Sequence, residues 1–327
     1  MKVLIIDPRV HTSLSKTYKH YDYLYDELKK YTDCFLYQSI NFNNIYEPLT
    51  HVREQGFNPD IIYFGMGYFA LSPPYFSKNL KTEDIDIPCV GFLYKPQNFL
   101  SEKLNFLKQF TAAISSIPNC KEYEKTTGIE FKVLSQAGDE KVFYDRKLEK
   151  IYDIGFSGAL HDNKLYVEGA FKSFNIRSRA QEILLKEKNL STFLNGSDDA
   201  SKRLPTYEEY AKKINQCRMW IATPAPFEEI TGRYYEIGMS NTLLFCSEIP
   251  KIYETILVDG KNCVTFDNNL NNFLDKFYYY LNNWQESEKI VSNAFQDFHN
   301  NHTWDNRAQQ LYRYFKKILE RKYEKQH

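Results

Sequence analysis

A short segment in the last third of the chain carries acidic and basic side chains at a spacing that could do chemistry. It reads PFEEITGRYYEIG, in which Glu228 and Glu236 are separated by seven residues and Gly232 and Arg233 lie between them. A helix places residues three and four apart on one face, so Glu229, Arg233 and Glu236 could line one side of a site. A mixed face of this kind is also common where a helix meets solvent, and spacing alone does not separate the two interpretations.

The expected position of these residues at a helix start favours the binding of a diphosphate. The apolar run 219–224 predicts a strand, and the helix is expected to begin near Thr231. Free backbone N–H groups and the positive end of the helix dipole attract anions there, and Arg233 adds a permanent charge. Glu236, one turn further on, could accept hydrogen bonds from ribose hydroxyls. The segment is therefore a candidate site for a nucleoside diphosphate.

Apolar runs alternate with helical stretches through the first half of the chain, which predicts a parallel sheet flanked by helices. The stretch 16–31 has helical spacing in its tyrosines and leucines. Strands are expected at 2–7, 34–38, 60–65, 88–94, 111–117 and 131–135. A charged connector follows at 145–150. Residues 1–148 are therefore predicted to form one Rossmann-like domain.

The same pattern restarts after the connector and predicts a second domain of the same α/β class. Strands are expected at 152–160, 192–196, 219–224, 242–247 and 262–266, and helices at 177–188, 207–217, 270–283, 285–299 and 303–325. Residues 149–303 would form a second Rossmann-like domain, and 304–327 a C-terminal helix that packs back on the first. Two such domains are expected to face each other across a cleft, where open α/β sheets bind ligands.

The composition is that of an ordinary globular protein with many aromatic residues and no net charge. Of the 327 residues, 43% are hydrophobic, 26% are charged and 16% are aromatic. The 42 basic and 42 acidic residues balance, which argues against nucleic acid as a partner. No apolar run approaches the roughly 20 residues that span a bilayer, and no signal peptide is recognisable, so we expect a cytoplasmic protein, with peripheral membrane contact left open. The six scattered cysteines indicate reduced thiols.

Several motifs occur in an order that resembles a known family. They are VGFLYKP, KIYDIGFSGAL, TGRYYEIGMSNTLLFCSE, ILVDGKNCVTF and NNHTWDNRAQQL. In this order they resemble the group 1 glycosyltransferases of GT-B architecture, and most closely the CgeB-like branch, in which a GR-x-x-E helix start and a terminal H-T-x-x-x-R element recur. The resemblance covers nearly the whole chain in the order of its elements, and it is strongest from about 129 to 311.

The resemblance implies that a nucleoside-diphosphate sugar, with UDP or GDP as the nucleotide, binds to the second domain. A glycan, a lipid-linked or a protein acceptor would bind to the first. In retaining members of such families the first Glu of an E-x7-E pair lies near the sugar and the second accepts from the ribose. These roles map to Glu228, with Glu229 as the alternative, and to Glu236. Arg233 would clamp the diphosphate, assisted by the backbone of Thr231 and Gly232. Such enzymes generally need no metal or cofactor.

Two departures from the family pattern affect the prediction. The motif helix is followed by Ser240-Asn241 where relatives have a small residue and Gly, although Asn tolerates the left-handed conformation that this turn requires. Many retaining relatives carry a His at the end of a middle strand of the first domain, where this chain has Tyr94-Lys95. Two rival functions stay open: a nucleotide-sugar epimerase on the same fold, and a binding protein that has lost catalysis, for which the Tyr94-Lys95 departure leaves room.

Further candidates for the donor site come from a Gly-rich turn and from two arginines. The expected strand in 152–160 enters a turn that contains Gly155, Ser157 and Gly158, where a missing side chain would allow phosphate to approach the backbone; a tight connection is the alternative. Arg177 and Arg179 open the next helix and could stabilise the negative charge that develops on a departing diphosphate. Ordinary surface arginines remain the alternative for at least one of them.

Candidates for the acceptor or sugar side are fewer. His11 follows the first strand, His161 follows the Gly158 turn, and Lys95 ends a middle strand. For each of the two histidines a non-functional role is the favoured alternative, and a lone histidine in a loop such as His161 is more often solvent-exposed. No cluster with the spacing of a metal site is recognisable, and Asp84 and Asp86 lie in the first domain, away from the expected donor.

Overall fold

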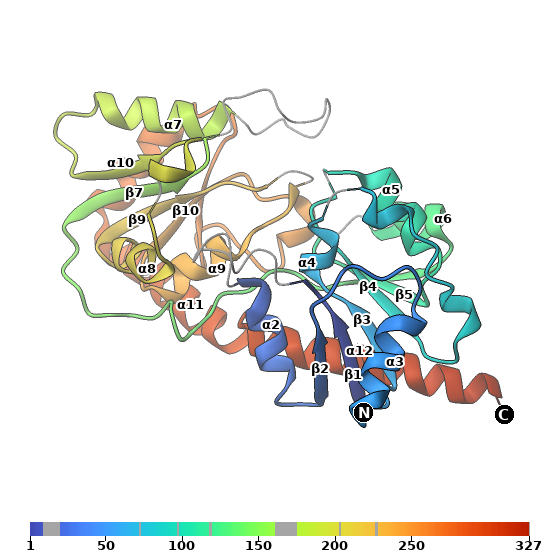
Figure 1. Cartoon of the computed structure of the whole chain (residues 1–327). Coiled ribbons are helices and arrows are strands. Elements are labelled where there is room, and N and C mark those ends of the chain that lie inside the picture. The colour runs from blue at the N-terminus through green and yellow to red at the C-terminus, as the bar shows by residue number, and fades with distance from the viewer. Residues whose placement is uncertain are drawn as a thin grey trace. The chain divides into compact units, whose positions relative to one another are not determined.

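The computed structural model divides the chain into two compact units (Figure 1). It describes residues 1–8, 20–71, 73–96, 98–117, 120–160, 175–202, 204–225 and 228–326. The first unit consists of Met1–Ser135 together with Trp304–His327, and the second of Gln136–Thr303. The division lies earlier in the chain than residue 148, where the sequence analysis placed it. The chain therefore leaves the first unit, forms the second, and returns.

The first unit is built on a six-stranded parallel sheet in the order β2-β1-β3-β4-β5-β6. Its strands are β1 (Lys2–Ile6), β2 (Asp33–Tyr37), β3 (Ile61–Phe64), β4 (Cys89–Leu93), β5 (Ala112–Ser115) and β6 (Glu130–Val133). Strands β3, β4 and β5 are completely buried, because helices cover both faces of a doubly wound sheet, and this is why they are continuous apolar runs in the sequence.

The helices of the first unit come from both ends of the chain. They are α2 (His20–Leu28), α3 (Tyr46–Glu54), α4 (Met66–Phe69), α5 (Leu100–Leu107), α6 (Cys120–Thr127) and α12 (Trp304–Gln326), with short 3-10 turns at Tyr75–Ser77 and Thr82–Asp84. Helix α12 belongs here because its apolar side is buried on this unit. The Phe315 ring, for example, lies 5.5 Å from the ring of Tyr63 on β3.

The second unit is a five-stranded parallel sheet in the order β11-β10-β9-β7-β8. Its elements are β7 (Tyr152–Gly158), α7 (Asn175–Lys186), β8 (Thr192–Gly196), a 3-10 turn (Ala200–Lys202), α8 (Tyr207–Asn215), β9 (Cys217–Ala222), α9 (Gly232–Met239), β10 (Leu243–Ser247), a 3-10 turn (Lys251–Tyr253), β11 (Val264–Phe266), α10 (Phe273–Asn282) and α11 (Trp284–Asn301). The chain passes from β7 to β8 in one direction and then to β9 in the other. The strand order therefore reverses between β7 and β9, and a crevice at their carboxyl ends is where such sheets bind ligands.

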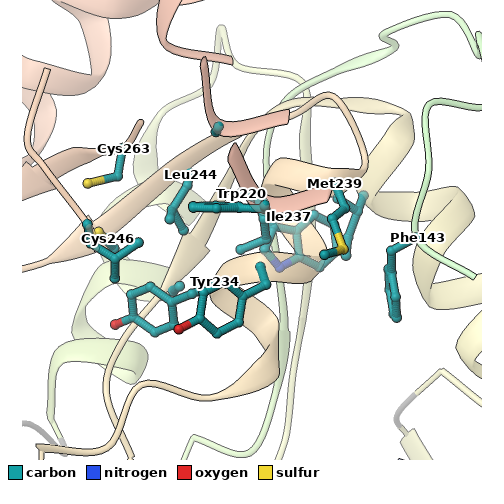
Figure 2. Packing of buried hydrophobic residues seen from close by; sticks show 14 of the residues in the cluster. Phe143, Trp220, Tyr234, Ile237, Met239, Leu244, Cys246 and Cys263 are labelled. Atoms are coloured by element: carbon teal, nitrogen blue, oxygen red, sulfur yellow. The ribbon is translucent and has the colours of Figure 1, made fainter. Parts of the chain in front are cut away.

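Two apolar clusters cover the faces of this sheet. One joins α8 and α9 to the sheet and includes Trp220, Tyr234 and Ile237 (Figure 2). The other lies under α7 and α10, and α11 contributes to both. A Cβ at Gly155 would lie 2.4 Å from the Trp220 ring, so glycine is required for the indole to cross β7. This packing fixes α9, the helix of the candidate motif, against the sheet.

Candidate functional site

In the second unit, an arginine side chain joins the ends of β7 and β9, where the strand order reverses. Arg177, on the first turn of α7, donates from Nη1 to the carbonyl oxygen of Ala159 over 2.9 Å and from Nε to Oγ1 of Thr223 over 2.6 Å. Ala159 directly follows β7 and Thr223 directly follows β9. The guanidinium of Arg177 is thus held where the strand order reverses.

A second arginine, Arg233, lies at the start of α9 beside the end of β7. Its Nε donates to the hydroxyl oxygen of Tyr210 over 3.0 Å. Its terminal nitrogens lie over Gly158, since a Cβ at that position would be 2.7 Å from Nη2 and 3.3 Å from Nη1. Gly158 also has a φ of +125°, which side chains rarely adopt. Within the described part of the chain, neither terminal nitrogen of Arg233 donates a hydrogen bond.

The backbone at the start of α9 adds donors to this cation. Thr231 is the N-cap residue in an extended conformation, and its side chain makes no capping hydrogen bond. The N–H groups of Gly232 and Arg233 find no acceptor among the residues that the structure describes. Gly232 is required here because a Cβ would lie 2.8 Å from the carbonyl oxygen of Ala137. The first turn of α9 is therefore a local concentration of positive charge and of N–H donors.

Glu236 lies one turn further along α9, and its carboxylate bends back toward the helix start. Its Oε1 would be 3.2 Å from a Cβ placed at Gly232. Burial raises the pKa of Glu236 to about 7; the Arg233 charge opposes the rise and Asp139 adds to it. The side chain is half-buried, and no described residue donates a hydrogen bond to its oxygens. The Glu236 carboxylate, which can accept hydrogen bonds, thus lies beside the N–H donors of Arg233.

Glu228 and Glu229, which precede α9, lie in different environments. Glu229 is only 6% exposed, and its Oε1 accepts a hydrogen bond from Nε2 of Gln136 over 3.2 Å. Its carbonyl oxygen also accepts from the backbone N–H of Ala225 over 2.7 Å. Glu228 is exposed and has a φ of +60°, a left-handed conformation that costs a non-glycine residue energy. Of the two, only Glu228 presents its carboxylate to solvent at the end of the β9–α9 loop.

The structure brings together only part of the predicted set. Gly158, Thr231, Gly232, Arg233 and Glu236 form one constellation, and Arg177 lies at the strand ends beside it. Arg179, by contrast, is exposed and donates to the carbonyl oxygen of Asn269 over 2.7 Å. Residues i and i+2 on a helix do not share a face, which explains why the two arginines of α7 diverge. Arg179 is not part of the constellation.

Of the three candidates for the acceptor side, the structure describes only Lys95. His11 and His161 lie outside the described residues. Lys95 belongs to the first unit, where it adopts a left-handed φ of 47° after β4 and places Nζ 5.5 Å from the centre of the Tyr94 ring. The buried Lys103 holds this turn by donating to the carbonyl oxygens of Tyr94 and Lys95 over 2.8 and 2.9 Å.

In the first unit the strand order reverses between β1 and β3, and the carboxylate of Asp7 lies at that point. Asp7, 1% exposed, follows β1 and accepts hydrogen bonds from the Tyr25 hydroxyl and, over 2.8 Å, from the backbone N–H of Gly67 on α4. A Cβ at Gly65 or Gly67 would come within 2.3 Å of an Asp7 oxygen. The Asp7 carboxyl group already accepts from the backbone at the start of α4, so we expect this end of the sheet not to bind a phosphate.

Tyr210 and Thr223 contact the site and were not predicted. Thr223 lies in the run 219–224, and its place directly after a strand was a usable signal. Tyr210 lies in the expected helix 207–217 among many other tyrosines, and nothing in the sequence distinguishes it. Among the described residues, no group of three or more His, Cys, Asp or Glu side chains could hold a metal ion. None of the described helices is long and apolar enough to cross a membrane.

The two parallel-sheet α/β domains match the GT-B fold of glycosyltransferase structural neighbours. Residues 173–313 match the family model described as glycosyl transferase-like. The crystal structure of the Anabaena protein HepE in complex with UDP matches with a TM-score of 0.60 at 13% identity, covering 97% of this chain and 100% of that one.

Two other solved structures show the same fold. Sucrose-phosphate synthase from Thermosynechococcus elongatus matches with a TM-score of 0.60 at 12% identity, over 97% of this chain and 99% of that one. T4 phage BGT, in complex with its UDP-glucose substrate, matches with a TM-score of 0.55 at 11% identity, over 98% and 99%. No curated protein matches by sequence. The likeness establishes the fold, while the CgeB-like branch stays a prediction.

Proposed function

We propose that the protein is a glycosyltransferase that takes a sugar from a nucleoside-diphosphate sugar, most simply a UDP-sugar. The observation that carries the proposal is the constellation at the start of α9. Arg233 offers two terminal nitrogens and the helix start offers two N–H groups, none of which has an acceptor among the described residues, and Glu236 offers a carboxylate beside them. These groups match the diphosphate and the ribose of a nucleotide. Structural neighbours solved with UDP or UDP-glucose support this assignment.

In this proposal each group acts on a defined part of the reaction. The acceptor hydroxyl oxygen bonds to the anomeric carbon of the sugar while the bond from that carbon to the diphosphate oxygen breaks. The electron pair leaves with the diphosphate, and the acceptor proton is released. Arg233, Arg177 and the start of α9 stabilise the charge on the leaving diphosphate. Glu236 holds the ribose, and Glu228 contacts the sugar.

Three finer features belong to the same proposal. Transfer with retention is supported by the spacing of Glu228 and Glu236. Independence from metal is supported by the cationic groups, which can balance the diphosphate charge themselves. A glycan, lipid-linked or protein acceptor is the class that the family resemblance implies, and we assign its binding to the first unit.

Calorimetric titration tests the donor site directly. We expect UDP or GDP to bind the wild-type protein and CMP to bind more weakly. Arg233→Ala should lower the affinity for the nucleoside diphosphate by at least tenfold, because hydrogen bonds to charged groups contribute about 1.5–3 kcal/mol. Arg179→Ala is the matched control and should bind as the wild type. The absence of binding to any nucleoside diphosphate would refute the proposal.

Transfer itself is tested by incubating the protein with a UDP-sugar and candidate acceptors in the presence of EDTA. Release of UDP that depends on an acceptor supports a transferase. Conversion of the sugar without any acceptor would indicate an epimerase, and tight binding without turnover would indicate a binding protein. The stereochemistry of the product, measured by NMR, decides whether the configuration is retained.

A further inference from the structure

The Arg233 side chain is held by a tyrosine that the sequence did not single out. The Nε of Arg233 donates to the hydroxyl oxygen of Tyr210, at 3.0 Å, and the guanidinium carbon lies 6.0 Å from the centre of the Tyr210 ring. This bond uses the one guanidinium N–H that points back along the side chain. It leaves Nη1 and Nη2, which form a planar pair suited to two phosphate oxygens.

The Tyr210 ring is itself fixed by the core of the second unit. It packs edge-on against Trp220 of β9, with ring centres 5.6 Å apart, and against Phe143, with ring centres 5.9 Å apart. Trp220 is fully buried and Phe143 nearly so. Tyr210 therefore has a rigid aromatic base and presents its hydroxyl at the edge of the core.

The chemistry of the hydroxyl suits this role. Burial raises the pKa of Tyr210 to about 12 although the nearby Arg233 charge opposes the rise, so the phenol stays neutral near pH 7. A neutral hydroxyl accepts a hydrogen bond from Arg233 through its oxygen and leaves the positive charge in place. A carboxylate at this position would cancel that charge. The cation therefore stays available for an anionic ligand.

From these contacts we propose that Tyr210 is a positioning residue that orients Arg233 toward a diphosphate. The inference rests on the proposed function, since it assumes that Arg233 binds that group. A long arginine side chain loses rotational freedom when it binds a ligand, and holding it in place beforehand reduces that loss. Removing the Tyr210 hydroxyl should therefore weaken the binding of the diphosphate and leave the binding of the rest of the nucleotide unchanged.

The test compares UDP with uridine, which lacks the diphosphate. Tyr210→Phe keeps the ring and removes only the hydroxyl. We expect its affinity for UDP to fall about tenfold, the size expected for one hydrogen bond to a charged group, while its affinity for uridine, measured by ligand-observed NMR, stays unchanged. Tyr234→Phe is the matched control: this buried tyrosine lies on α9, and its hydroxyl has no hydrogen-bond partner in the described structure. It should bind both ligands as the wild type does.

A double-mutant cycle completes the test. In an Arg233→Ala background, Tyr210→Phe should cause no further loss of UDP affinity, because its effect acts through Arg233. The inference is overturned if Tyr210→Phe binds UDP as the wild type does, or if it loses UDP and uridine affinity equally, which would indicate a structural role. If the wild-type protein binds no UDP at all, the proposed function fails first and the inference fails with it.

Discussion

Glu228 and Glu229 are adjacent residues with opposite environments, and single substitutions should separate their roles. Glu228 has a left-handed backbone and an exposed side chain, whereas Glu229 is buried and bonded to Gln136. A strained, exposed residue at the end of a loop is typical of a functional position. A buried carboxylate with a hydrogen-bond partner is typical of a structural one.

We predict that Glu228→Ala lowers the rate of sugar transfer at least tenfold without lowering the free energy of unfolding. Glu229→Ala should instead destabilise the protein by about 1–3 kcal/mol, because it removes a buried carboxylate that accepts a hydrogen bond from the Gln136 amide. Denaturant unfolding and a transfer assay on the two variants provide the comparison. A stable Glu229 variant with no activity, beside an active Glu228 variant, would reverse the assignment.

The carboxyl of Glu236 should make nucleotide binding depend on pH. Burial raises its pKa to about 7, so a large fraction is protonated at neutral pH in the free protein. The ionised form is the better acceptor for ribose hydroxyls, so UDP affinity should rise as the pH increases from about 6 to 8. The terminal phosphate of UDP also ionises, near pH 6. UDP titrations of Glu236→Gln at several pH values separate the two effects. The UDP affinity of this variant should change only near pH 6, where the phosphate ionises.

The same carboxyl should lower stability where it is ionised. Its pKa is higher in the folded than in the unfolded protein, so the folded state binds the proton more tightly between about pH 4.5 and 7. The contribution of Glu236 to stability is therefore lost as the pH rises through that range. We expect Glu236→Gln to be more stable than the wild type at pH 8 by about 1 kcal/mol, less than the full pKa difference implies because the side chain is partly exposed. Thermal unfolding at pH 5 and pH 8 measures this.

At the scale of elements, the turn that ends β7 decides how closely Arg233 approaches the strand end. Gly158 has positive φ, and any side chain there meets the Arg233 guanidinium. Gly260 offers a matched comparison in the same unit, because it also has positive φ, +73°, but a Cβ there meets nothing within 4 Å. Both positions have positive φ, and only the first brings a side chain into contact with Arg233.

Gly158→Ala should therefore reduce UDP affinity about tenfold, whereas Gly260→Ala should leave it unchanged. Gly260→Ala should lose about 1 kcal/mol of stability and Gly158→Ala at least as much, because alanine disfavours positive φ. Calorimetry with UDP and denaturant unfolding are the two measurements. Equal UDP affinity in both variants would show that the contact between residue 158 and Arg233 is unimportant for binding.

The elements themselves were largely predictable, and the contacts between side chains were not. Buried parallel strands are recognisable as apolar runs, and the expected helix start near Thr231 is confirmed by α9 beginning at Gly232. The left-handed conformation expected at Asn241 is also confirmed, with a φ of 53°. The bond between Tyr210 and Arg233 joins α8 to α9, and no local pattern encodes the packing of two helices. The divergence of Arg177 and Arg179 was predictable from helical geometry alone.

At the scale of the molecule, two similar sheets should differ in what they bind. Where the strand order reverses, the second unit has Arg177, Arg233 and two N–H groups at the start of α9 that find no acceptor among the described residues, whereas the first has the Asp7 carboxylate. We therefore expect one nucleotide per chain, with UDP slowing hydrogen exchange in the peptides of β7, α7 and α9 and not around Asp7. Calorimetric stoichiometry and hydrogen exchange followed by mass spectrometry test this. Two nucleotides per chain, or protection around Asp7, would contradict it.

The return of the chain to its first unit has a consequence for the order in which the protein is completed. During synthesis, residues 136–303 emerge before α12, so the second unit has all of its sequence while the first still lacks this helix. The missing helix is the one whose Leu311 and Phe315 are buried in the complete protein. The sheet formed early is thus the last to be covered. A stop codon after Thr303 would leave the apolar face of the first unit open to aggregation, although every residue assigned to the nucleotide would already be in place.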